Sequence, residues 1–174
     1  SFQDALIFIR FLFIPILCYF IFFKKRELFK QTLLVITILV IFVCIDSFYQ
    51  FLNYTPENGF GEDLLGFKSN WYGRLTGPFG DELIPGSYIS KFGLLGFAFL
   101  ISIKKFENKI IFHSIYLSSI LFISFISGER MAFATFGLSL LFLFLFLNGF
   151  RKSIFLSIIF GIFLIFMTTY LHPS

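Results

Sequence analysis

The chain has 174 residues, of which 57% are hydrophobic and only 14% are charged, with a formal net charge of +4. A typical soluble domain carries about 25% charged residues. The composition therefore excludes an ordinary soluble fold and predicts an integral membrane protein, with the 31 phenylalanines as part of the lipid-facing surface. The chain begins at Ser1 and stops soon after its last apolar run, so we expect a fragment of a longer protein.

Six apolar stretches follow one another along the chain. Crossing about 30 Å of hydrocarbon takes about 20 mostly apolar residues in a helix, and none of the stretches has the strict alternation of a barrel strand. We predict an all-α, polytopic transmembrane helical bundle that forms a single membrane domain over residues 1–174, with an extended outer loop at about 50–85. The predicted spans are residues 5–23, 31–49, 86–103, 110–126, 131–148 and 154–171.

The orientation follows from the cations. Connections 24–30, 104–109 and 150–152, after the first, third and fifth spans, hold nine of the 14 Lys and Arg residues. Short cationic connections stay on the cytoplasmic side. The outer loop and the turn at 127–130 are therefore predicted on the opposite face.

Arg10 and Asp46 are charged residues inside the first two predicted spans. Charge within a span is costly and usually faces a polar interior. Arg10 in the first span and Asp46 near the outer end of the second are therefore expected to form a structural pair.

The outer loop is acidic as a whole. From Tyr49 to Pro85 it contains two cations and five acids, a net charge of −3. An anion bound there must be held by particular arginines, because the general field repels it.

The most polar part of this loop is the segment 74–88. It begins with Arg74, and its glycines, Gly77 and Gly80, allow a backbone path that brings amide N–H groups close to a ligand. Asp81 and Glu82 would orient a guanidinium or receive a proton. The alternative is a solvated turn whose acids are favourable near the start of the next helix.

A second arginine stands in the short turn Ser127-Gly-Glu-Arg130 between two spans. A guanidinium at this boundary can present a planar fork of donors to phosphate oxygens. The alternative is an interfacial arginine paired with Glu129. Lys91 is a further cation near the outer face.

Other chemistry has no signature here. The sequence lacks metal-ligand spacing, a P-loop and a nucleophile elbow, so we expect no metal, no cofactor and no nucleic-acid partner. His113 reads as a core residue, and His172 is an isolated histidine on the outer face.

The segment 74–88, followed by a span, a cationic loop, a second span and the turn 127–130, resembles the middle of bacterial O-antigen ligases and O-antigen polymerases. The resemblance covers about residues 70–148. It implies a metal-independent membrane glycosyltransferase of the C-type superfamily in the bacterial inner membrane, with its active face toward the periplasm. Its donor would be a polyprenyl-diphosphate-linked glycan, and its acceptor either lipid A core or another lipid-linked glycan.

In that family, outer-face arginines grip the donor diphosphate, and Arg74 and Arg130 are the matching positions. The general base is expected outside this fragment, on a large periplasmic loop. The residues expected to support the arginine pair are Gly77, Gly80, Asp81, Glu82, Gly86, Ser87, Tyr88, Lys91 and Glu129. Two other classes remain open: a transporter or flippase of lipid-linked glycans, and a structural membrane scaffold.

Overall fold

The computed structural model describes residues 19, 26–55, 57, 59–103 and 109–171. Most of the predicted first span, with Arg10, lies outside the described residues, as does His172. The expected pair of Arg10 with Asp46 therefore stays a prediction.

The described residues form helices joined by turns and one long irregular segment, and no named strand occurs among them. The all-helical prediction is confirmed for this part of the chain. The helices are α2 (Arg26–Leu52), α3 (Pro85–Ser102), α4 (Ile110–Ile126), α5 (Arg130–Phe146) and α6 (Arg151–Leu171), with the short 3-10 turns η1 (Gly77–Phe79) and η2 (Asn148–Phe150). Helix α3 begins at Pro85, one residue before the predicted span, and proline suits this position because it lacks the N–H that a first helical residue leaves unpaired.

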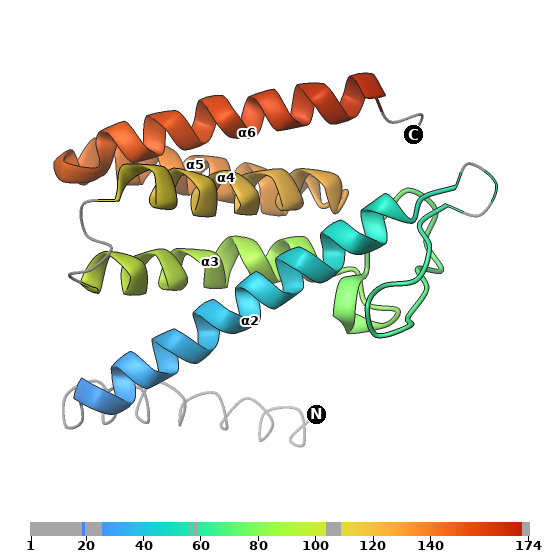
Figure 1. Ribbon diagram of the computed structural model, residues 1–174, viewed down its shortest axis with the longest axis horizontal. Coiled ribbons are helices and arrows are strands. Elements are labelled where there is room, and N and C mark those ends of the chain that lie inside the picture. The colour runs from blue at the N-terminus through green and yellow to red at the C-terminus, as the bar shows by residue number, and fades with distance from the viewer. Residues whose placement is uncertain (1–18, 20–25, 56, 58, 104–108, 172–174) are drawn as a thin grey trace, which may run out of the picture.

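Helix α4 is the centre of the bundle. It packs against α2, α3, α5 and α6, while α2 crosses α3 obliquely (Figure 1). The segment between α2 and α3 gathers at one end of the bundle, where α6 also ends (Figure 1). The outer loop and the end of α6, which were predicted on the same face, therefore lie at the same end of the bundle.

The helix surfaces are apolar and their buried faces carry small polar residues. The hydroxyls of the buried residues Ser114, Ser118 and Ser157 donate hydrogen bonds to carbonyls of their own helices. Large apolar side chains cover the exposed faces of α2 and α6. A soluble bundle has the reverse pattern.

Two helical segments, Glu27–Leu52 and Asn148–Tyr170, are long and apolar enough to cross a membrane, and less than a third of each is buried in the bundle. These features suggest a membrane protein. The count of six spans stays a prediction.

Helices α3 and α4 approach closely at glycines. A Cβ on Gly96 would lie 3.3 Å from Thr37 Oγ1 and would overlap the hydroxyl of Tyr116. That hydroxyl donates a hydrogen bond to the carbonyl of Gly93 at 3.1 Å, so the ring is not free to move away.

We predict that Gly96→Ala lowers the thermal unfolding midpoint of the chain in detergent, because overpacking a tight contact costs about 1–3 kcal/mol. The matched control is Gly137→Ala in α5, where the added Cβ meets nothing within 4 Å. Alanine is the better helix former by about 1 kcal/mol, so the control should unfold at the same or a higher temperature. Equal shifts in both variants would contradict the packing argument.

Candidate functional site

The outer segment is attached to the last turns of α2. Gln50 is fully buried, and its Oε1 accepts hydrogen bonds from the amides of Thr76 at 3.0 Å and Gly77 at 2.9 Å. Its Nε2 donates to Thr76 Oγ1 at 3.3 Å. One side chain of α2 therefore fixes the turn η1 from which α3 follows.

A second attachment lies one turn earlier on α2. Asp46 is fully buried, and its Oδ1 accepts a hydrogen bond from the amide of Leu64 at 2.9 Å. Its carboxyl group lies against that of Asp63, which is also buried. The Oδ2 atoms of both acids have no hydrogen-bond partner among the described residues.

The backbone at Arg74 is held by its neighbours. Ser69 Oγ donates to the carbonyl of Arg74 at 2.7 Å, and the amide of Arg74 donates to the carbonyl of Trp71 at 3.3 Å. Leu75, the next residue, is fully buried. The start of the Arg74 side chain is therefore fixed, although the side chain itself is exposed.

The carboxylate of Glu129 caps helix α3. It accepts hydrogen bonds from the amides of Gly86 at 2.7 Å and Ser87 at 3.1 Å, and from the hydroxyl of Ser87. The residue before α3, Ile84, supplies no side-chain cap. A carboxylate at this position suits the positive end of the helix dipole.

This cap corrects one interpretation of the sequence. Both Glu129 and Arg130 are described residues, and no ion pair joins them, so the alternative of a neutralised Arg130 is wrong. Gly86 has a packing reason to be glycine, since a Cβ would lie 3.0 Å from Glu129 Oε1 and would overlap Ser127 Oγ.

Arg74 and Arg130 line one pocket of about 420 Å³, here called the arginine pocket. Its lining residues are Tyr72, Gly73, Arg74, Phe125, Gly128, Glu129, Arg130 and Phe133. Gly128 has φ +77°, and a Cβ on it would lie 3.2 Å from Arg74 Cγ. The outer segment and the turn before α5 are therefore in contact, and the two predicted arginines belong to the same site.

The electrostatics of this pocket favour an anion. Neither guanidinium has a hydrogen bond or an ion pair with any residue that the structure describes. Helix α5 begins at Arg130 without a side-chain cap, so its first amides also contribute partial positive charge. Glu129 faces the same pocket, but its oxygens are engaged at α3.

Two tyrosines extend the rim. The hydroxyl of Tyr72 lies 3.4 Å from that of Tyr54, and this contact raises the pKa of Tyr54 above its ordinary value. The phenol of Tyr54 is therefore neutral near physiological pH.

Several predicted supporting residues lie elsewhere. The amide of Gly77 is taken by Gln50, so the expectation that it faces a ligand is wrong. Asp81 accepts a hydrogen bond from Asn70 Nδ2 at 2.5 Å, and neither it nor Glu82 lines the arginine pocket.

The remaining supporting residues also lie outside the pocket. Gly80 adopts φ +66° after η1, with open space beside it. Tyr88 packs its ring against Phe79 and Phe92, and Lys91 is exposed on α3.

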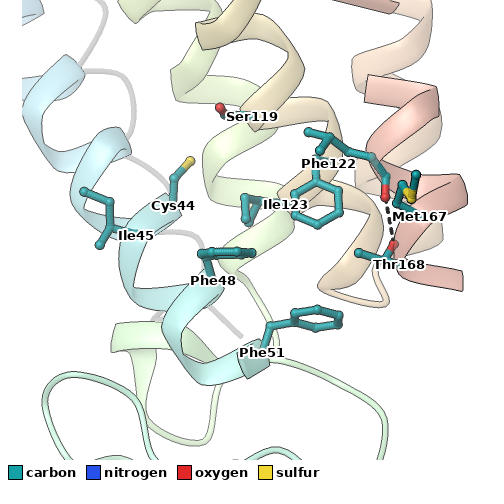
Figure 2. A pocket seen from close by; sticks show the side chains of 10 residues that line it. Cys44, Ile45, Phe48, Phe51, Ser119, Phe122, Ile123, Met167 and Thr168 are labelled. Atoms are coloured by element: carbon teal, nitrogen blue, oxygen red, sulfur yellow. Dashed lines mark hydrogen bonds between the residues drawn. The ribbon is translucent and has the colours of Figure 1, made fainter. Parts of the chain in front are cut away.

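An apolar groove of about 500 Å³ lies between the outer halves of three helices (Figure 2). Helices α2 and α6 form its walls and α4 its floor. Figure 2 shows Phe48, Phe51 and Phe122 among the side chains that line it. The full lining is Cys44, Ile45, Phe48, Phe51, Ser119, Phe122, Ile123, Leu164, Met167 and Thr168.

The groove and the arginine pocket are close together. A smaller hollow of about 170 Å³ shares Phe51 and Thr168 with the groove, and it shares Gly73, Phe125 and Gly128 with the arginine pocket. The two cations and the apolar groove therefore lie on either side of this small hollow. Sequence reasoning missed this groove because residues of three separate helices line it. The one signal within a single helix is that small residues stand among large apolar ones.

Comparisons with protein-family models, with curated proteins and with solved structures found no match. The resemblance to O-antigen ligases and polymerases therefore rests on the sequence segments quoted above.

We predict that Glu129→Ala destabilises the chain, because the first amides of α3 lose their acceptor at a buried position, and an unsatisfied buried group costs about 1–3 kcal/mol. The thermal midpoint in detergent should fall. Glu129→Gln, which keeps one acceptor oxygen, should recover part of the loss. Glu82→Ala, an exposed acid of the same outer segment, is the control and should change little. An unchanged midpoint in Glu129→Ala would refute the cap as a stabilising contact.

Proposed function

We propose that this chain is part of a membrane glycosyltransferase of surface-polysaccharide assembly, which transfers a glycan from a polyprenyl-diphosphate donor on the periplasmic face of the bacterial inner membrane. The acceptor would be lipid A core in a ligase or a lipid-linked glycan in a polymerase. The observation that carries the proposal is the arginine pocket, where two guanidinium groups far apart in sequence meet without counter-ions among the described residues.

The nearby groove supports the lipid half of this donor. A polyprenyl diphosphate combines a compact dianionic group with a long apolar chain. The diphosphate would lie between Arg74 and Arg130, and the chain would follow the small hollow into the apolar groove. A free nucleotide or phosphate would make no use of the groove.

The proposed topology agrees with the distribution of described cations. Lys109, Arg151 and Lys152 stand at the starts of α4 and α6, at the end of the bundle opposite the gathered outer segment (Figure 1). Cationic connections favour the cytoplasm, so the arginine pocket would face the periplasm. This assignment uses the six predicted spans.

The chemistry follows from where charge develops. The acceptor hydroxyl attacks the anomeric carbon while the bond from that carbon to the diphosphate oxygen breaks, and the diphosphate leaves with the electron pair. The hydroxyl proton passes to a base, which we place outside this chain. Because negative charge grows on the leaving group, guanidinium groups beside it stabilise the transition state more than the ground state. With two cations supplied by the protein, we expect no metal requirement.

A transporter or flippase is the less favoured alternative. Transporters place polar binding groups near the midplane in broken helices. The one histidine inside a described helix, His113, is buried between the rings of Phe97 and Phe150. That packing favours a structural role for it.

We predict that Arg74→Ala and Arg130→Ala each reduce glycan transfer by about 10²–10³-fold, the usual loss when one such donor is removed. Transfer would be measured in cells that depend on the full-length protein, with membrane protein levels compared by immunoblot. Arginine-to-lysine variants should recover only part of the activity, because lysine keeps the charge but lacks the planar fork. Lys68→Ala, an exposed cation of the outer segment away from the pocket, is the control. Near-normal transfer by either alanine variant would remove that arginine from the site.

We also predict that Ser119→Phe, which fills the apolar groove, impairs transfer from a long-chain donor but leaves a short-chain diphosphate analogue usable. Ser139→Phe is a matched control, since Ser139 lines a separate apolar hollow on α3 and α5. Both serine hydroxyls bond the carbonyl four residues earlier at 2.8 Å, so the substitutions are alike locally. Equal loss in both variants, or equal loss with both donors, would exclude the groove as the lipid site.

A further inference from the structure

The outer segment contains a turn with its apolar side chains pointing outward. Leu64, Leu65 and Phe67 are 48%, 55% and 46% exposed. The acid beside them, Asp63, points inward and is buried. Three large apolar side chains within four residues are unusual for a loop surrounded by water.

The N–H groups of this turn need no water. Each amide N–H from residue 63 to residue 67 has an acceptor inside the protein. Asp63 accepts three of these hydrogen bonds. Its Oδ1 accepts from Leu65 at 2.9 Å and Phe67 at 2.7 Å, and its carbonyl accepts from Gly66 at 3.2 Å. The other acceptors are the carbonyl of Phe67, for Asp63 at 2.9 Å, and Asp46 Oδ1, for Leu64 at 2.9 Å. Satisfied N–H groups lower the cost of placing a turn beside hydrocarbon, where each unpaired backbone group is costly.

The bond from Leu64 to Asp46 also sets the depth of the turn. Asp46 lies six residues before the end of α2 at Leu52, which is about 9 Å along the helix axis. The turn therefore lies beside the outer end of α2 and not beyond it. Glu62 and Lys68 flank the turn and form what is here called its neck. Their backbones pair with each other, and both charged side chains are exposed, so the neck is polar.

We propose that residues 63–67 form a wedge that enters the outer lipid leaflet, with Leu64, Leu65 and Phe67 among the acyl chains next to the headgroups. The charged neck would lie at headgroup level, as interfacial segments arrange their polar residues. The occupant of this surface is lipid, since the turn offers apolar side chains and no free amide to a more specific partner. The inference goes beyond the proposed transferase and uses none of the arginine pocket.

The single tryptophan of the chain makes the depth measurable. In a Trp71→Phe background, Leu65→Trp carries the only indole, and the chain is reconstituted into vesicles of phosphatidylethanolamine and phosphatidylglycerol. We expect the fluorescence emission of this indole to be blue-shifted. Lipids that carry bromine near the headgroup end of the acyl chains should quench it, and aqueous acrylamide should not.

The control is Glu57→Trp in the same background, in the turn that Thr55 and Gly59 close by mutual backbone hydrogen bonds. It should respond to acrylamide and ignore the brominated lipids. Phe67→Trp repeats the wedge measurement with an aromatic-for-aromatic change. Quenching of both wedge probes by acrylamide would place the turn in water, and quenching by neither agent would mean that protein covers it. Either outcome overturns the proposal.

Discussion

The hydrogen bonds from Gly86 and Ser87 to the Glu129 carboxylate are the contact on which the outer end of the bundle depends. They join the start of α3 to the residue before α5, two points far apart in sequence. With these two starts held together, Gly128 lies against Arg74. One half-buried carboxylate therefore joins the two starts, and its oxygens are engaged at α3.

The last turns of α2 make the second half of this arrangement. Gln50 holds η1, and Asp46 holds the turn near Leu64. Polar side chains in an apolar helix are costly unless they are paired, and here their partners are backbone amides of the outer segment. The outer segment therefore folds onto α2. One side of this segment faces the arginine pocket, and its apolar turn points outward on the other side.

Particular residues show how much of the structure the sequence predicted. The approximate ranges of the described helices followed from apolar length. Arg74 and Arg130 were predicted as site residues because arginines stand out in a strongly apolar sequence. The cap made by Glu129 was not predicted, because the amides that it accepts from belong to another helix. Gln50 gave no signal, since a polar residue near a helix end is ordinary until its partner is known.

The sequence by itself determined the helical class, the apolar exterior and the identity of the two cations, because these depend on composition and on short-range periodicity. Only the tertiary structure decided that the two cations share one pocket, that an apolar groove between α2, α4 and α6 lies near this pocket, and that Asp46 on α2 holds the turn at 63–67. The physical reason is that each of these features is made by contacts between residues far apart in sequence. Such contacts depend on how the helices cross, and helix crossing is set by packing at positions such as Gly93 and Gly96 that look alike in any apolar span.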